Sequence, residues 1–331
     1  MSRRRYFLFR SLQTVFLLWL IMTFLFFFFR LMPGDYIDLM LYEGIPPSTA
    51  EQLVERWGLN EPLYVQYFNY MTNLATGDAG FSLQTRTSVW SYVSMKIFNT
   101  FILVAPGITL GYLLGSGIGT LLGIKRGTRF ERVGLVTSVF LGTLPIFFIG
   151  IILIAFFSTG LDWLPSSGML SPASGGKWAD APWWRPYTTK DFALHYILPF
   201  SAIVLRYINT PALVMRTSVV EVLGQDFIAY QRVTGLPKLN RIKHLAKHAS
   251  LPALTLYPVA MTRALSGLVL LEVVFNWPGI GQALVQAVLF RDFAVVQFIF
   301  LLLAVFILLG NWGVDILYGV IDPRVSVEDG N

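Results

Sequence analysis

The residues of this 331-residue chain that could do chemistry do not assemble into a catalytic or metal-binding pattern. His244 and His248 have the i, i+4 spacing of two zinc ligands. Leu245 stands where a zinc protease with that spacing has its general-base glutamate, and no third ligand is apparent; His195 is the remaining histidine. There are no cysteines, which excludes disulfides and thiolate metal sites. We therefore expect this chain to bind no metal and no cofactor.

The sequence also lacks a nucleotide-binding motif. No G-x-x-x-x-G-K-[ST] occurs, because Gly176-Lys177, the one Gly-Lys pair, is followed by Trp178. The apolar stretches hold no Ser–Lys or paired-Asp set of the kind that an intramembrane protease needs. We expect that the chain is not an enzyme and that any work it does is mechanical.

Two arginines are unusual because each lies near the middle of a long apolar stretch. These residues are Arg206 and Arg263, and placing an arginine at that depth in a membrane helix costs about 2.5–3.5 kcal/mol. One interpretation is that both face a watery path and attract the carboxylates of a passing solute. The other is that they are buried against helix-end carbonyls or against a carboxylate elsewhere. The sequence leaves both interpretations open.

The elements that carry these residues are helices in lipid. The chain is 55% hydrophobic and 13% charged, whereas soluble domains are about 25% charged. Six stretches are long and apolar enough to cross a bilayer: 11–31, 98–124, 133–158, 195–220, 251–275 and 293–321. The sequence thus predicts an all-α, polytopic membrane protein with a single transmembrane domain. Its parts are a first helix and outer segment (1–97), core helices (98–321) and a tail (322–331).

The basic residues are distributed unevenly among the connecting segments, which sets the orientation. Fifteen of the 25 lie on one set of segments: Arg3, Arg4, Arg5, Arg10, Lys125, Arg126, Arg129, Arg132, Arg216, Arg232, Lys238, Arg241, Lys243, Lys247 and Arg324. This pattern predicts cytoplasmic N- and C-termini. It also assigns the net charge of +6 to membrane topology and not to nucleic-acid binding.

Glycine recurs every fourth residue in the second predicted span, at Gly111, Gly115, Gly119 and Gly123. Such a stripe removes side chains from one helix face and lets a second helix approach closely. The loop 159–193 on the outer side holds four tryptophans and has two interpretations, an interfacial anchor or a docking surface for a soluble partner.

The segment 218–250 is polar, basic and placed between two apolar stretches. Leu223, Phe227 and Tyr230 recur at i, i+4 and i+7, which predicts an amphipathic helix over 218–234. Gly235 can take a positive φ after the last helical residue, and Pro237 prevents continuation. A second, basic helix over about 238–249 would complete a cytoplasmic hairpin, suited to insertion into a groove on a partner.

This hairpin and its flanks resemble the coupling loop of ABC-importer permeases of the dipeptide, oligopeptide and nickel branch. The matching positions are Arg216-Thr217-Ser218, Glu221-Val222-Leu223, Asp226-Phe227, Gly235-Leu236, His244, Lys247 and Leu251-Pro252. Further matches cover nearly the whole chain: Arg30-Leu31-Met32-Pro33-Gly34-Asp35, Gly58-Leu59, Pro62-Leu63-Tyr64-Val65-Gln66-Tyr67, Gly77-Asp78-Ala79-Gly80, Asn99-Thr100, Leu144-Pro145, Trp163-Leu164-Pro165, Arg291-Asp292-Phe293 and Asp322-Pro323-Arg324. The most specific piece is the run from Glu272 to Gly281, EVVFNWPGIG. Gln231 and Thr234 depart from the family's usual alanine and lysine.

The resemblance implies a type I permease with six membrane helices in a prokaryotic cell membrane. Its implied partners are a second homologous permease, two ATPase subunits that bind ATP and Mg²⁺, and an extracytoplasmic solute-binding protein. The residues expected to contact an ATPase are Asp226, Phe227, Tyr230, Gln231, Arg232, Gly235 and Leu236. Short peptides are the expected solutes, with nickel complexes or other small solutes as the alternative.

Two other classes of function remain as alternatives. An ion-coupled secondary carrier would transport without an ATPase and would place titratable groups at mid-membrane, where this chain has arginines. An intramembrane enzyme would need one of the catalytic sets that are missing.

Overall fold

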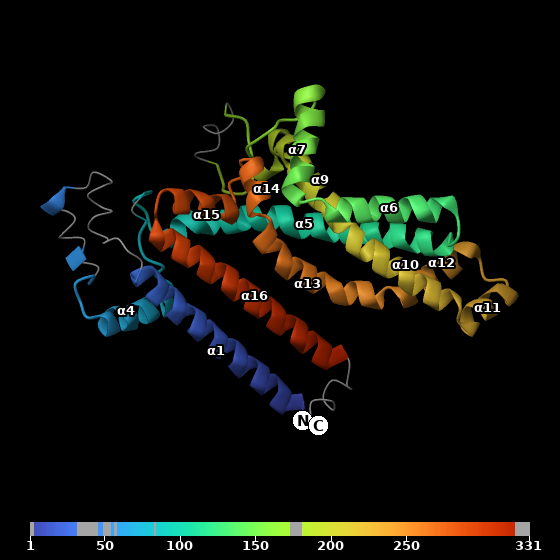
Figure 1. The fold of residues 1–331 in the computed structure, drawn as a ribbon, viewed down its shortest axis with the longest axis horizontal. Helices are drawn as coiled ribbons and strands as arrows, with labels where there is room; N and C mark the ends of the chain where they lie inside the picture. Colours follow the sequence, from blue (N-terminus) through green and yellow to red (C-terminus); the bar gives the residue numbers. More distant parts are fainter. Residues whose placement is uncertain are drawn as a thin grey trace. The chain divides into compact units, whose positions relative to one another are not determined.

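The computed structural model describes residues 3–31, 46–48, 54–55, 58–82, 84–172 and 181–321. Helices make up the regular structure of these ranges, apart from an isolated bridge between Phe81 and Ser88 (Figure 1). The predicted all-α class is confirmed. The chain forms two compact units, one of residues 1–98 with 283–331 and one of residues 99–282. The predicted tail, 322–331, lies outside the described residues.

The first unit is built around two long antiparallel helices, α1 (Arg3–Arg30) and α16 (Phe293–Ile321). Near one end Trp312 Nε1 donates to Ser11 Oγ at 3.1 Å, and near the other the rings of Phe29 and Phe293 have centroids 6.0 Å apart. The amphipathic α4 (Leu63–Ala75) is joined to α1 by a hydrogen bond between Thr23 and the Tyr67 hydroxyl. Most of α15 (Ile280–Leu289) also belongs to this unit.

The second unit contains the C-terminal part of α5 (Val89–Ile124) and the helices up to the start of α15. These are α6 (Arg129–Thr143), α7 (Ile146–Leu153), a π-helical segment Ile154–Gly160, a 3₁₀ turn Arg185–Thr188, α9 (Lys190–Tyr207), α10 (Asn209–Leu223), α11 (Asp226–Val233), α12 (Lys238–Ala249), α13 (Leu251–Gly267) and α14 (Val269–Val274). Its apolar core includes Leu103, Ile108, Leu198, Ile203 and Trp277, all fully buried. These side chains come from α5, α9 and the segment after α14, so the core ties distant parts of the sequence together.

The predicted count of six spans is not confirmed. Among the described residues four helices are long and apolar enough to cross a membrane: Phe7–Arg30, Val89–Ile124, Lys190–Leu223 and Phe293–Gly313. A fifth span results if Arg129–Thr143 and Ile146–Gly160 count as one, although they meet at 103°. The predicted stretch 251–275 is divided between α13, of 17 residues, and α14, of 6.

The bend between α6 and α7 divides the predicted span 133–158 into two helices. Leu144 has extended backbone angles, φ −70° and ψ 134°, and Pro145 follows it as the N-cap of α7. A residue before proline avoids the helical region, because the proline ring clashes with its backbone N–H and Cβ. The proline therefore ends α6 and starts a new helix in another direction.

The glycine stripe of α5 lies directly against α9 and α10. A Cβ at Gly111 would be 3.0 Å from Val204 O, and one at Gly119 would contact Ala212 O and lie 2.8 Å from Met215 Cβ. Gly115 and Gly123 are equally confined, against Ile208–Pro211 and Val219 respectively. Because the neighbours are largely backbone atoms, they cannot rotate away, and the three helices approach as closely as their main chains allow.

A buried carboxylate organises the run Glu272–Gly281. Glu272 is 1% exposed, and its oxygens accept hydrogen bonds from Thr100 Oγ1 at 2.7 Å and from the amides of Gly281 and Gln282 at 2.8 and 3.1 Å. These amides belong to the first turn of α15, where N–H groups have no helical partner and a negative charge is stabilised. The conspicuous glutamate of this motif thus caps a helix and ties it to α5.

The glycine packing predicts a position-specific effect of adding one methyl group. Gly115→Ala places its Cβ against Ile208 O and 2.6 Å from Pro211 Cγ, so it should destabilise the fold by about 1–3 kcal/mol. Gly117→Ala in the same helix meets nothing within 4 Å and should be neutral or stabilising by up to about 1 kcal/mol. Thermal unfolding of the detergent-solubilised variants measures both effects, and equal melting temperatures would contradict the packing.

Candidate functional site

The hairpin that follows α10 consists of two short helices, α11 and α12. The predicted single helix over 218–234 is wrong: α10 ends at Leu223, Gly224 caps it with φ −82° and ψ −3°, and α11 begins at Asp226. Glycine in a helix interior costs about 1 kcal/mol relative to alanine, and Asp226 is well placed to start a helix because its charge favours the N-terminal end. The chain can therefore turn between α10 and α11.

The corner between α11 and α12 has the conformation that the sequence predicts. Gly235 has φ +73°, and the Leu236 amide donates to Gln231 O at 3.2 Å. A hydrogen bond from an amide to the carbonyl five residues earlier, with a glycine at positive φ between them, is the Schellman motif that ends a helix. Pro237 then serves as the N-cap of α12 with φ −55° and ψ 142°. The corner is thus fixed by backbone geometry.

Apolar contacts attach the hairpin to α10. Met215, Val219 and Val222 of α10 pack with Ile228 of α11, and on the α12 side with Leu245 and Ala249. Between the two short helices, the rings of Phe227 and His248 have centroids 4.9 Å apart. Gln231 Nε2 lies 3.3 Å from His244 Nδ1. The two histidines therefore serve as packing partners of α11, and no group of three or more acidic or histidine side chains in the described ranges could hold a metal ion.

The outer face of the hairpin exposes apolar side chains. Tyr230 is 70% exposed, Val233 86% and Leu239 63%. Asp226 is also exposed, Leu236 is half-buried, and the side chain of Arg232 lies outside the described residues. A rigid corner that presents an aromatic ring and aliphatic side chains to its surroundings has the character of a protein-docking surface.

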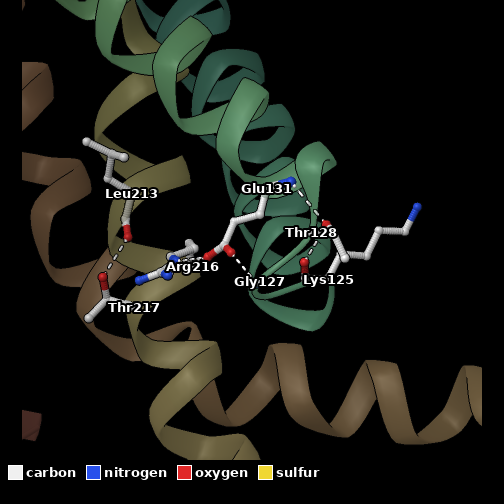
Figure 2. Close-up of polar contacts among 7 residues, drawn as sticks. All are labelled: Lys125, Gly127, Thr128, Glu131, Leu213, Arg216 and Thr217. Carbon is white, nitrogen blue, oxygen red and sulfur yellow. Dashed lines mark hydrogen bonds and ion pairs between the residues drawn. The ribbon is translucent and has the colours of Figure 1, made fainter.

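An ion pair joins α10 to the turn between α5 and α6. Figure 2 shows Glu131 of α6 and Arg216 of α10 pointing toward each other; Arg216 Nε donates to Glu131 Oε1 at 2.8 Å, and Nη2 contacts the same oxygen. The second carboxylate oxygen accepts the Gly127 amide at 2.6 Å. Glu131 is 6% exposed. Its charge thus fixes the α5–α6 turn and α10 in one arrangement.

Sequence reasoning missed Glu131, although a signal for it exists. Thr128 is the N-cap of α6, and its side chain accepts the Glu131 amide at 3.3 Å (Figure 2). Thr128 and Glu131 have the spacing of a capping box, in which the glutamate returns to the backbone before the helix. That spacing locates the carboxylate, but only the fold shows that Arg216, 85 residues later, shares it.

The two mid-span arginines lie in different environments. Arg206 is half-buried in the last turn of α9, with Cζ 5.9 Å from the centroid of the Tyr207 ring. Arg263 lies in α13 and is exposed on this chain. Their predicted role in a solute path stays a prediction.

The ion pair predicts a specific loss of stability. Arg216→Met leaves the buried Glu131 carboxylate without its cationic partner, so the melting temperature of the purified chain should fall by several degrees. Arg132→Gln is the matched control, because Arg132 is an exposed cation one residue from Glu131. Equal and small changes in melting temperature for the two substitutions would contradict a stabilising Glu131–Arg216 contact.

Known proteins resemble this chain over nearly its whole length. Residues 107–327 match the family described as "Binding-protein-dependent transport system inner membrane component", and residues 3–103 match the N-terminal part of such components. The di/tripeptide transport system permease protein of Pseudomonas aeruginosa is 36% identical over 307 residues, which cover 89% of this chain and 91% of the relative. The dipeptide transport system permease protein of Escherichia coli is 34% identical, with 90% and 91% covered.

A third relative extends the similarity to almost every residue. The glutathione transport system permease protein of Pectobacterium atrosepticum is 30% identical over 324 residues, or 98% of this chain and 99% of the relative. The family region 107–327 includes the hairpin and α10, on which it packs. The chain belongs to the inner membrane components of binding-protein-dependent transport systems.

Proposed function

We propose that this chain is the transmembrane permease subunit of an ATP-driven importer of short peptides. The named relatives are permeases for dipeptides, tripeptides and glutathione. The chain provides half of the translocation path and hydrolyses nothing itself, while separate ATPase subunits bind ATP and Mg²⁺. A second homologous permease completes the path, and an extracytoplasmic binding protein delivers the peptide.

The orientation follows from the basic residues. The α5–α6 turn and the hairpin carry most of the clustered lysines and arginines of the described connections, and such segments remain in the cytoplasm. Both termini are then cytoplasmic, in a prokaryotic cell membrane, and the chain acts as a single permease domain.

The observation that carries this proposal is the combination of exposure and attachment in the hairpin. Tyr230 and Val233 are free to enter a groove on an ATPase, whereas Ile228 on the same short helix is 5% exposed and packs on α10. Asp226, Phe227, Gln231, Arg232, Gly235 and Leu236 complete the coupling segment. Closure of the ATPase dimer on ATP moves the hairpin, and α10 transmits this movement to α5 and α6.

The path itself would use Arg206 and Arg263. A guanidinium favours bidentate binding of a carboxylate, and every short peptide has one at its C-terminus. The two arginines would lower the cost of moving that charge through the membrane.

The docking surface predicts a selective loss of ATPase binding. Tyr230→Ala removes the largest exposed apolar side chain of the hairpin and should weaken ATPase association by about 30-fold or more, the effect of losing an interface hot spot. Tyr64→Ala, at a 75% exposed tyrosine of α4, is the control. Co-purified ATPase and ATP-dependent uptake of a labelled dipeptide are measured; wild-type values for Tyr230→Ala would contradict the proposal.

The conformation of Gly235 predicts a variant in which ATP hydrolysis no longer drives uptake. Gly235→Val forces a β-branched residue into φ +73°, at a cost of about 1–2 kcal/mol, so the hairpin should change shape and ATP-driven uptake should fall while the chain still inserts. Gly224→Val is tolerated because that residue has φ −82°. Normal uptake by Gly235→Val would show that the corner does not set coupling.

A further inference from the structure

Helix α12 has one buried face and one basic face. Leu245 and Ala249 are 3% and 1% exposed and pack on α10. Lys243 and Lys247 are exposed and, at one helical turn from each other, lie on a different side of the helix. The proposed ATPase contact uses Tyr230 and Val233 of α11 and Leu239 in the first turn of α12, and it does not need these lysines.

The side of α12 that carries the two lysines continues into α13, where it carries exposed leucines. Ser250, between α12 and α13, has φ −77° and ψ −20°, so the backbone stays helical there. Lys243, Lys247, Leu251 and Leu254 follow at i, i+4, i+8 and i+11, which places them on one face. Leu251 is 57% exposed and Leu254 63%. Lys247 lies one turn and Lys243 two turns before Leu251, so with these leucines in lipid the lysine ammonium groups would lie at the depth of the phospholipid headgroups.

A second basic segment lies at the same end of α10. The α5–α6 turn has four exposed cations, Lys125, Arg126, Arg129 and Arg132. It joins α10 at Arg216, while α12 packs on Val219 and Val222. The Glu131 carboxylate in this turn is already paired with Arg216. The exposed acids nearby, Glu221 and Asp226, are outnumbered by the exposed cations of the two segments.

We propose that this basic surface, Lys243 and Lys247 of α12 together with the cations of the α5–α6 turn, binds the phosphate groups of anionic phospholipids. Clusters of lysine and arginine directly beside a membrane helix attract such lipids. Bound headgroups would hold the base of the hairpin at the bilayer surface while α11 engages its partner. The proposal rests on the proposed cytoplasmic position of the hairpin, because the cytoplasmic leaflet of the membrane carries the negative surface potential.

The direct test measures lipid retention by the purified full-length chain, without any ATPase. The chain is extracted from bilayers of phosphatidylcholine with about one-third phosphatidylglycerol, and the bound phosphatidylglycerol is counted by native mass spectrometry. Lys243→Gln/Lys247→Gln should lower phosphatidylglycerol affinity by roughly 25-fold, at about fivefold for each lysine. Arg185→Gln/Lys190→Gln removes two exposed charges from the 3₁₀ turn and the start of α9 and should retain wild-type binding.

Two further experiments show whether a loss of phosphatidylglycerol binding is due to the lost charge. Lys243→Arg/Lys247→Arg keeps both charges and should bind the lipid as the wild type does. Lipid binding by the wild type should weaken as salt rises from about 50 to about 500 mM, because surface charges are screened over that range. Equal retention by both glutamine variants, or no salt dependence, would overturn the proposal. So would unchanged lipid retention with loss of co-purified ATPase, which would assign the lysines to a protein contact. Because the lipid measurement needs no ATPase, failure of the proposed transport function would not be mistaken for failure of this site.

Discussion

The direct contact of α10 with α5 and α6 is the constraint on which the candidate site depends. Four glycines of α5 leave room for the backbone of α9 and α10, and Glu131 holds Arg216 at the end where the hairpin begins. Backbone contacts and a buried charge pair are both intolerant of small displacements. A force on the hairpin therefore moves α10, and α10 moves the helices packed on it.

This arrangement fits the proposed role of a membrane subunit that is driven by separate ATPase partners. Energy from a reaction elsewhere can be used only if it arrives as a displacement, so the chain needs a surface to receive it and a stiff connection to transmit it. In the proposed function Tyr230 and Val233 form that surface, and the packing of Ile228 and Leu245 on α10 forms the connection. This division between surface and connection matches the sharp difference in exposed fraction between residues of one short helix.

Local signals in the sequence predicted the local structure well. The left-handed Gly235, the start of α12 after Pro237 and the helix from Phe293 to Ile321 follow from backbone preferences and apolar length. The break at Gly224 was missed, because apolar periodicity continues across it and hides the interruption. The Glu131–Arg216 pair could not be predicted, since its partners are 85 residues apart and meet only in the fold. Function was predicted mainly by the resemblance in ordered motifs.

The most direct test of the central claim is a distance measurement between α12 and α6 during the ATP cycle. The chain has no cysteines, so nitroxide labels can be attached at Asn240→Cys and Val136→Cys, both exposed positions. Double electron–electron resonance on the assembled transporter, with and without bound ATP, then reports whether hairpin and helix move together. A narrow distance distribution that ATP leaves unchanged is the expected result. A distribution that shifts or broadens with ATP would show that the hairpin moves independently of the membrane helices, which contradicts the account.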